Sequence, residues 1–403
     1  MGGALNGYRV LDFGRYISGP FCAALLADMG AEVIRIEPNA GSDDRYVMPI
    51  GQDNSGGGAV HHHVNRNKQS IAIDLARPEG RKLVERLIAG ADVVVANIPP
   101  KALAKAGLDY DTLRSIKPDI ILTTVNAYGL NSPYENEIGF DCTGQALSGA
   151  MSLTGTPDQP YRSAVSYVDY STAISAALGT VAALLKRERT GEGEHVHCSL
   201  LKTALTITNS MLIEEASGAR SRIATANRSP ISGPSDLFRT RDGWIMIQII
   251  GNAMFRRWTE LVEAPELVND PRFADDQSRG DNGEVLSAIT SAWTENKTID
   301  ECLKLAAAHR LPVTPMLSPA QALTASEAIE SGMFQYVPTQ NGQQLPIVSS
   351  LCDFANDDNK SPAPAPALGA HTTAILTKAG IDAETIDRLF SDGTISETPA
   401  PVD

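Results

Sequence analysis

The sequence predicts an α/β fold in which a large unit built on a parallel sheet is joined to a smaller α+β unit. The chain has 403 residues, enough for about two to three domains, and 42% of them are hydrophobic. Its first third alternates short β-branched runs with helical patterns, which is typical of βαβ units that feed a parallel sheet. Near the middle the composition turns polar, and a strand followed by helical patterns comes after this break.

The elements of the large unit follow one rhythm. A buried run at 8–13 predicts the first strand, and a helix at 21–29 leads to the second strand at 32–37. Pro78 suits the first turn of the next helix and Gly90 suits its end. The remaining strands are predicted at 70–74, 93–96, 120–126 and 195–199, and the helices at 78–90, 139–155, 171–189 and 200–216.

Composition also predicts the domain boundaries. We expect residues 1–217 to form the first part of the large domain, 218–235 a polar linker, 236–325 the small domain, and 326–403 a linker and a return segment that completes the large domain. The small domain is predicted to hold a strand at 244–250 and helices near 253–262, 284–295 and 298–309. A Pro-alternating tether at 356–367 is expected to be extended, and terminal helices follow at 372–379 and 383–389.

The charge balance excludes several classes of partner. Lys and Arg number 34 against 48 Asp and Glu, and the net charge of −14 repels nucleic acid and anionic membrane surfaces. The opening residues lack the pattern of a secretory signal, and no run reaches the roughly 18 uninterrupted apolar residues of a membrane span. The 5 scattered cysteines are typical of reduced thiols. We therefore expect a cytoplasmic protein with no nucleic-acid or membrane partner.

Motifs for nucleotide and acyl chemistry are incomplete. The segment 8–37 is similar to the start of a dinucleotide fold, but its turn reads GRYISGP instead of G-x-G-x-x-G, so we interpret Glu37 as a plain strand-end acid. A P-loop and a G-x-S-x-G nucleophile elbow are both missing.

Histidines occur in two groups that bear on metal binding. The run 61–63 is interpreted as part of a polar loop, and His195 and His197 share one face of a predicted strand. Neither group has further ligands at fixed offsets, so we expect no metal site.

Asp169 is the carboxylate that stands out. It lies in SYVDYSTA, in a short polar loop ahead of a long helix, where helix amides and the helix dipole favour an anion. An aspartate in this place is more often an N-cap than a catalytic group.

Several ordered segments point to a family. They are LNGYRVLDFGRYISGPFCAALLADMGAEVIRIEP at the start, NRNKQSIAIDL at 65–75, RPEGRKL at 77–83, ADVVVANIPP at 91–100, GFDCTGQALSGAMSLTG at 139–155, VDYSTAISAALGTVAALLKRERTGEGEHVHCSLL at 168–201 and PALGAHT at 366–372. Together they resemble the class III CoA-transferase family of the CaiB/BaiF type, which includes formyl-CoA transferase and carnitine CoA-transferase. The resemblance is clear over residues 5–205, looser in the middle, and clear again at the last segment.

The resemblance implies an architecture. The large domain would be Rossmann-like and made from both ends of the chain, with the small domain inserted between linkers. Two chains would interlock as a homodimer, with the active site between the large domain of one and the small domain of the other. Composition and periodicity do not indicate this interlocking.

The resemblance also implies an activity, acyl-CoA:carboxylate CoA transfer. Asp169 occupies the position of the family's nucleophile, which would attack an acyl-CoA to form a mixed anhydride and then an aspartyl-CoA thioester. The tetrahedral intermediates would need amide donors and exclusion of water. The implied partners are acyl-CoA and a free carboxylic acid, with no metal and no cofactor beyond CoA as co-substrate. Transfer would run between two acids or within one dicarboxylic acid.

Residues that contact CoA are carried over from the family one by one. They are Tyr16, Ile17, Ile73, Arg77, Asn97, Ile98, Lys105, Ala106 and Leu200. Lys105 stands where the family often has a cation for phosphate. Pro38 and Ala76 replace basic residues of some members, so we expect Arg77 or Arg35 as a substitute.

Two residues are expected to face the substrate, and one of them separates this chain from a branch of the family. Arg15 would pair with the second carboxylate of a dicarboxylic acid. Phe140 stands in GFD at 139–141, where the racemase branch has Gly-His-Asp, and phenylalanine cannot carry a proton. A 2-methylacyl-CoA racemase or epimerase is the alternative activity, and a CoA-binding protein without catalysis is the second alternative. The linker segment at 228–238 lacks the glycine-rich loop of formyl-CoA transferases, which argues against formyl or oxalate specificity.

Overall fold

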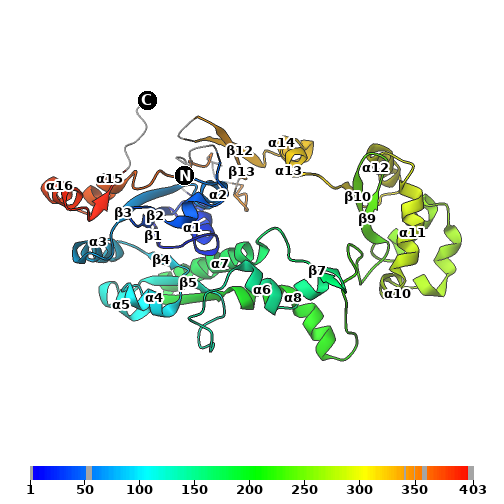
Figure 1. Ribbon diagram of the computed structural model, residues 1–403, viewed down its shortest axis with the longest axis horizontal. Coiled ribbons are helices and arrows are strands. Elements are labelled where there is room, and N and C mark those ends of the chain that lie inside the picture. Colours follow the sequence, from blue (N-terminus) through cyan, green and yellow to red (C-terminus); the bar gives the residue numbers. More distant parts are fainter. Residues whose placement is uncertain (1–2, 51–56, 340–341, 349, 356–360, 398–403) are drawn as a thin grey trace. The chain divides into compact units, whose positions relative to one another are not determined.

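A computed structural model describes residues 3–50, 57–339, 342–348, 350–355 and 361–397 (Figure 1). Part of the predicted tether, 356–360, lies outside the described residues. The chain divides into two compact units. The large unit combines Met1–Ser148, Ala164–Ile207 and Glu330–Asp403, and the small unit combines Gly149–Ser163 and Thr208–Ile329.

The large unit is built on a seven-stranded sheet with the order β14-β3-β2-β1-β4-β5-β8. Its strands are β1 (Arg9–Asp12), β2 (Glu32–Glu37), β3 (Lys68–Ile73), β4 (Val93–Ala96), β5 (Ile121–Asn126), β8 (Glu194–Ser199) and β14 (Ile395–Ser396). The first six are parallel, and β14 pairs antiparallel with β3. This confirms the α/β prediction. The strand order reverses between β1 and β4, which is where doubly wound folds open a crevice at the carboxyl ends of their strands.

Helices cover both faces of this sheet. One face carries α1 (Ser18–Asp28), α2 (Ala59–Val64), α7 (Tyr167–Thr190) and the start of α8 (Leu200–Ala216). The other carries α3 (Pro78–Ala89), α4 (Pro100–Lys105), α5 (Tyr110–Ile116), α15 (Thr372–Lys378) and α16 (Ala383–Ser391). Neighbouring residues of β1 point to opposite faces, so Val10 joins one buried cluster and Leu11 the other.

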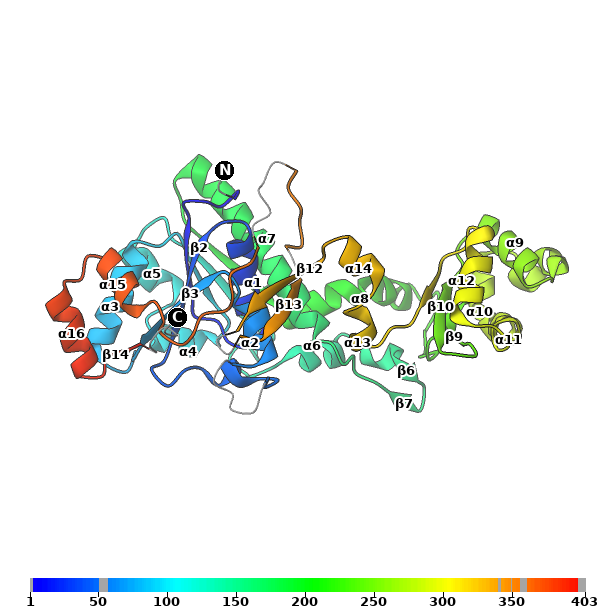
Figure 2. The ribbon, with the colours of Figure 1, turned by 90° about the horizontal axis from the view of Figure 1, so that it is seen from above.

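The C-terminal return segment attaches to β3, and its two helices, drawn in red, lie beside α3 (Figure 2). The predicted Gly-x-His-Thr element makes the attachment. The amide of His371 donates to the carbonyl of Ser70 at 3.0 Å, and Thr372 Oγ1 donates to the carbonyl of Ser396 at 2.8 Å. Both ends of the chain therefore build the large unit, as the resemblance implied.

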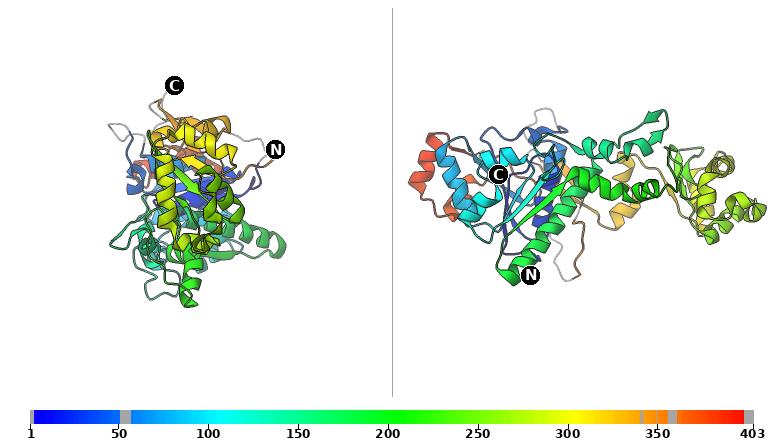
Figure 3. Two further views of the ribbon diagram at one scale, coloured as in Figure 1. Left: turned by 90° about the vertical axis from the view of Figure 1, so that its right-hand side faces the viewer. Right: turned by 90° about the horizontal axis from the view of Figure 1, so that it is seen from below.

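The small unit has α+β composition, as predicted, and its yellow and yellow-green helices can be seen together in the right panel of Figure 3. Its antiparallel sheet has the order β11-β10-β9, from β9 (Ser235–Arg239), β10 (Trp244–Gln248) and β11 (Val313–Pro315). The helices are α9 (Asn252–Leu261), α10 (Asp276–Asp281), α11 (Gly283–Thr294) and α12 (Ile299–Ala308). Their shared core is aromatic, with Phe238, Phe255 and Trp258 buried.

Shorter elements complete the two units. They are α6 (Asp141–Leu147), β6 (Gly155–Thr156), β7 (Gln159–Pro160), α13 (Pro319–Ala322), α14 (Ser326–Glu330), β12 (Phe334–Pro338) and β13 (Gln344–Val348).

Three sequence-based assignments were wrong. The helix predicted at 139–155 is only α6, because Gly149 and Gly155 take left-handed φ values of 83° and 100° and turn the chain into β6. The helix predicted at 171–189 begins earlier, at Tyr167. The histidine run is not a loop but part of α2, a short helix that forms because Val60 and Val64 bury their side chains in the core.

Among the described residues, α7 is the one helix long and apolar enough to cross a membrane by length and composition. This is weak evidence, because a core helix of a globular domain has the same character. Val168, Ala173 and Ala176 of this helix are buried in the cluster that contains α1 and β5.

Candidate active site

A cavity of about 280 Å³ opens in the large unit where β1, β4 and β5 end. Its lining comes from the β1–α1 turn, the ends of β4 and β5, the loop before α6, and the first turns of α7 and α8. Residues expected from the sequence that line it are Arg15, Tyr16, Asn97, Ile98, Phe140, Asp169 and Leu200. The structure therefore brings most of the predicted site into one cavity.

Asp169 lies in the first turn of α7, and its N-cap alternative is wrong because Ser166 occupies the N-cap position. The first amides of α7 do not bind the Asp169 carboxylate either. The amides of Val168 and Asp169 donate to Oδ2 of Asp141, at 2.8 and 3.1 Å. The carboxylate of Asp141, not that of Asp169, is therefore the anion that the start of this helix stabilises.

The environment of Asp169 disfavours its charged form. Burial, followed by the negative charge of Asp141, raises the pKa of Asp169 from 3.8 to about 7. No cation among the described residues is paired with it. A carboxylate that is charged near neutral pH, poorly solvated and unpaired is a candidate nucleophile or base.

Asp141 is fixed from its own helix. Its Oδ1 accepts a hydrogen bond from Gln145 Nε2 at 2.5 Å, while Oδ2 takes the amides of α7. Gly144 allows α6 to approach, since a Cβ at this position would lie 2.9 Å from Cγ1 of Val168. The short α6 thus helps to position Asp169, 28 residues later, and the charge of Asp141 adds to the effect of burial on the pKa of Asp169.

The β1–α1 turn is supported from below by a buried ion pair. Asp12 accepts from the amide of Gly14 at 2.8 Å and from Lys68 Nζ at 2.7 Å, and Lys68 also donates to the carbonyl of Pro20 at 2.7 Å. Burial lowers the pKa of Lys68 to about 8, against the opposing charge of Asp12. Breaking a buried pair of this kind leaves an uncompensated charge, so the turn has a rigid base.

Asn97 holds the same turn from the side. Its Oδ1 accepts from the amide of Arg15 at 2.7 Å, and its Nδ2 donates to the carbonyl of Arg15 at 2.7 Å and to Ser18 Oγ at 3.1 Å. Gly19 leaves room for this amide, because a Cβ there would lie 2.9 Å from Asn97 Oδ1. Packing against Asn97 therefore explains why GRYISGP has a glycine at position 19, and a bound pyrophosphate is not needed to explain it.

Two aromatic rings stand at the mouth of the cavity. Tyr16, with a left-handed φ of 59°, is 41% exposed, and Phe140 is 52% exposed, although both line the cavity. Their ring centroids are 5.8 Å apart with an interplanar angle of 89°, an edge-to-face contact.

A second cavity, of about 290 Å³, shares Arg15 and Ile98 with the first. The expected CoA contacts Ile73 and Ala106 line it, together with Pro38. The two cavities could therefore accommodate the two ends of one elongated ligand that passes Ile98.

Other expected contacts lie outside both linings. Ile17 is half-buried at the N-cap of α1, Arg77 is exposed and lies 3.4 Å from Asp74, and Lys105 is exposed at the end of α4. Arg35 is wrong as a substitute phosphate cation, because its side chain is fully buried and paired with Asp44 at 2.9 Å.

Glu37 lines the second cavity, but its carboxylate is already used. It lies 3.3 Å from Arg35 and 2.5 Å from Arg45. Burial alone would raise its pKa, but the two guanidinium groups outweigh this and hold the pKa at about 2. Glu37 is thus a structural acid whose ion pairs occupy both of its oxygens.

The histidines do not form a metal site with their neighbours. His195 and His197 line a third cavity of about 310 Å³, and His195 Nε2 lies 2.8 Å from Thr124 Oγ1. Burial, followed by the charges of His195 and Lys202, lowers the pKa of His197 to about 4. Within the described part of the chain, no three His, Cys, Asp or Glu side chains cluster as metal ligands.

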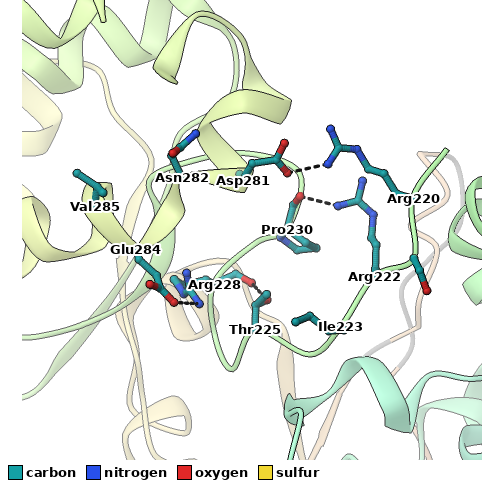
Figure 4. A pocket seen from close by; sticks show the side chains of 12 residues that line it. Arg220, Arg222, Ile223, Thr225, Arg228, Pro230, Asp281, Asn282, Glu284 and Val285 are labelled. Atoms are coloured by element: carbon teal, nitrogen blue, oxygen red, sulfur yellow. Dashed lines mark hydrogen bonds and ion pairs between the residues drawn. The ribbon is translucent and has the colours of Figure 1, made fainter. Parts of the chain in front are cut away.

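A cavity of about 580 Å³ in the small unit is larger than the Asp169 cavity (Figure 4). It lies between the segment 220–230 and helices α10 and α11. Each of its guanidinium groups has a carboxylate partner: Arg220 with Asp281, Arg228 with Glu284, and Arg222 with Glu214. The first two pairs attach the segment to α10 and α11, and the third attaches it to α8, so each charged side chain of the lining has an ion-pair partner.

Sequence reasoning missed part of the site. The lining residues Glu137, Ile138 and Gly139, and the support from Asp141, were not predicted, whereas Asn126, at the end of its strand, was already a weak substrate-site candidate from the sequence. The signal was present, because GFD was recognised as a family segment. Assigning 139–155 to a single helix hid the loop that brings these residues to the cavity.

Residues 5–372 match the model of CoA-transferase family III. Succinyl-CoA–D-citramalate CoA-transferase of Chloroflexus aurantiacus is 38% identical over 300 residues, 74% of each chain. Succinate–glutarate CoA-transferase of Agrobacterium fabrum is 30% identical over 394 residues, 95% of this chain and 96% of that one. The crystal structure of a CaiB/BaiF family protein from Brucella suis has a TM-score of 0.83 at 30% identity and covers 94% of this chain and 100% of its own. The protein thus belongs to the class III CoA-transferase family and is a CoA-transferase.

Proposed function

We propose that the enzyme moves CoA from a short dicarboxylic acyl-CoA, such as succinyl-CoA, to a second dicarboxylic acid, with Asp169 as the covalent relay. One observation carries this proposal: Asp169, with its pKa near 7, shares a cavity with Arg15. The side chain of Arg15 is exposed, and no described carboxylate pairs with it. The relatives named for succinyl-CoA and D-citramalate, and for succinate and glutarate, support a dicarboxylic substrate class.

The proposed reaction has four steps. The Asp169 carboxylate attacks the thioester carbonyl, and the C–S bond breaks to give a mixed anhydride and CoA thiolate. The thiolate attacks the aspartyl carbonyl, releasing the first acid and leaving an aspartyl-CoA thioester. The carboxylate of the second acid attacks this thioester, which gives a new anhydride and frees the thiolate again. The thiolate then attacks the acyl carbonyl of the new anhydride, and Asp169 returns as a carboxylate.

The chain's residues fit these steps without a metal or a redox cofactor, because a carboxylate serves as both nucleophile and leaving group. We propose that the thioester end of CoA lies beside Leu200 and Asp169 in the first cavity. The distal part would pass Ile98 into the second cavity, beside Ile73 and Ala106. Lys105 and Arg77 are exposed cations that adjoin the lining residues Ala106 and Ala76 in sequence, and we propose them for the phosphates.

We also propose that the enzyme works as a homodimer in the cytoplasm. Helix α7 exposes Ile174 by 45%, Leu178 by 71% and Leu185 by 53%, an apolar face that a second copy would cover. The 5 cysteine thiols all lie in described residues and are unpaired, which suits a reducing compartment. Leu178→Glu should convert the dimer to monomer in light scattering, and an unchanged mass would argue against this face.

Acid exchange tests the activity. Wild type with succinyl-CoA should pass CoA to labelled glutarate, malate or citramalate with ping-pong kinetics, and Asp169→Asn should lower kcat/KM at least about 1,000-fold.

Arg15→Gln should raise the KM for a dicarboxylic acid about tenfold and leave the KM for acetate or butyrate unchanged. Equal use of monocarboxylic acids by the wild type would refute the dicarboxylic class. Deuterium uptake at the α-carbon of an acyl-CoA without any acceptor acid would favour the racemase, and CoA binding without exchange would favour the inactive alternative.

A further inference from the structure

The exposed rings of Tyr16 and Phe140 are not explained by the core of the large unit. Tyr16 lines the cavity from the β1–α1 turn and Phe140 from the residue before α6, and their rings meet edge to face at 5.8 Å. Neither ring is buried, although aromatic side chains gain more than most from burial. Exposed apolar rings at the mouth of a cavity commonly contact what enters it.

The backbone of each ring is firmly held. Both backbone polar groups of Arg15, the neighbour of Tyr16, are bound by Asn97 at 2.7 Å. Tyr16 itself stays at a φ of 59°, which a tyrosine rarely adopts. Such a conformation persists when the surrounding structure imposes it, and it is often found at functional sites.

The backbone of Phe140 belongs to the same hydrogen-bond network that holds the first turn of α7, where Asp169 lies. Its amide donates to Thr143 Oγ1 at 3.1 Å, and its carbonyl accepts from the amide of Thr143 at 2.8 Å. The next residue, Asp141, binds the first amides of α7. The backbone of Phe140 therefore has a fixed position relative to the Asp169 turn, and side-chain truncation leaves these backbone bonds in place.

Water is the competitor that this site must control. In the relay of the proposed function, the mixed anhydride and the aspartyl-CoA thioester are both open to attack by water. Water oxygen would bond to the acyl or aspartyl carbonyl, a proton would pass to solvent, and the carboxylate or thiolate would leave. The sum is acyl-CoA plus water giving free acid plus CoA thiol, which wastes the thioester. Excluding water from a closed site prevents this kind of side reaction.

We propose that Tyr16 and Phe140 form an aromatic gate that keeps water from the acylated Asp169 and so decides between CoA transfer and acyl-CoA hydrolysis. This inference rests on the proposed function, because it needs the covalent intermediates on Asp169. Two flat apolar rings at the mouth narrow the path to the carboxyl, while the pantetheine arm of CoA fills the remaining opening beside them.

The experiment uses the full-length enzyme and succinyl-CoA as the probe. Phe140→Ala opens one side of the gate, and Phe140→Leu is the conservative variant that keeps an apolar side chain. Tyr16→Gly opens the other side and removes the unfavourable left-handed tyrosine, since glycine adopts this φ without strain. Tyr336→Ala is the matched control, because Tyr336 is 57% exposed on β12 and lines neither large-unit cavity. Transfer is followed by label exchange with glutarate, and hydrolysis by CoA thiol release without an acceptor, with ¹⁸O from labelled water in the succinate.

We expect the ratio of hydrolysis to transfer to rise at least about tenfold in Phe140→Ala and in Tyr16→Gly. In Phe140→Leu the ratio should stay within about threefold of the wild-type value, and in Tyr336→Ala it should not change. An unchanged ratio with a higher KM for succinyl-CoA in both opened variants would overturn the gate and make the rings simple binding contacts. A parallel fall of transfer and hydrolysis in both would also overturn it. Failure of the proposed function has a separate signature, since the wild type would then show no exchange between labelled glutarate and succinyl-CoA.

Discussion

The Asp169 cavity and the arginine cavity of the small unit differ in size and in charge balance. The arginine cavity, at about 580 Å³ against about 280 Å³, is roughly twice as large and richer in charged groups. Yet its guanidinium groups are each matched by a carboxylate, whereas Asp169 has a raised pKa and forms no ion pair with a cation in the described part of the chain. Paired charges stabilise the folded state. A buried acid without an ion pair lowers the stability of the folded state, and its perturbed pKa is typical of a functional group. The difference shows that charge imbalance identifies this site better than volume does.

The largest expected effect is on folding stability. Asp169 has a pKa of 3.8 when unfolded and about 7 when folded, so the unfolded chain releases its proton first and wild type loses stability as pH rises from about 4 to about 7. Asp169→Asn removes this loss. We expect the variant to be more stable than wild type by up to about 4 kcal/mol at pH 8 and equally stable at about pH 4, as measured by urea unfolding. A variant that is less stable than wild type at pH 8 would show that the ionised Asp169 side chain does not destabilise the folded state.

A smaller effect tests whether activity depends on the hydrogen bonds by which Asn97 holds the β1–α1 turn. Asn97→Ala removes the hydrogen bonds to both backbone groups of Arg15, and the turn with Tyr16 should shift. We expect kcat/KM for succinyl-CoA to fall about 10- to 100-fold, because displacement of a catalytic wall by about 1 Å is costly. An unchanged kcat/KM, with only a lower melting temperature, would limit Asn97 to a structural role.

The pH profile gives a still smaller effect. Only the carboxylate form of Asp169 is nucleophilic, so kcat/KM of the wild type should rise as pH increases through about 7. Asp141→Asn keeps an oxygen for the α7 amides but removes the charge that helps to raise this pKa, and the rise should move down by up to about one pH unit. The same midpoint in both enzymes would assign the raised pKa to burial alone.

The smallest effect is expected in the arginine cavity. The Arg220–Asp281 pair is about 40% exposed on both side chains, and exposed pairs contribute about 0–1 kcal/mol. Arg220→Ala should therefore change kcat/KM by less than about twofold and stability by less than about 1 kcal/mol. A large loss of activity in this variant would contradict the contrast between the two cavities.

Much of the fold could be predicted from the sequence, because buried parallel strands read as apolar runs whatever surrounds them. The strands at 32–37 and 93–96 and the helix at 200–216 have the predicted bounds. Several elements were not found in this way, and two of them show why. The two-residue strand β14 exists only because β3 offers it an edge, and α2 exists because Val60 and Val64 meet a core built elsewhere in the chain.

The site shows the same division. Asp169 and the residues at the strand ends were identified because family segments carry them, and the structure brings them to one cavity. The role of Asp141 could not be predicted, because it depends on two amides 27 and 28 residues away, and only tertiary packing brings these to its carboxylate. Arg35 failed as a phosphate cation for a similar reason, since burial beside Glu37 and Asp44 is not visible in a local pattern.

The most direct test of the relay is intact-mass spectrometry of the enzyme after incubation with a panel of acyl-CoAs, with and without hydroxylamine, for wild type and Asp169→Ala. The account predicts an acyl- or CoA-sized adduct on wild type that hydroxylamine removes and that the variant lacks. Turnover of succinyl-CoA and an acceptor acid with no adduct on wild type, or the same adduct on Asp169→Ala, would contradict the claim that Asp169 carries the transferred group.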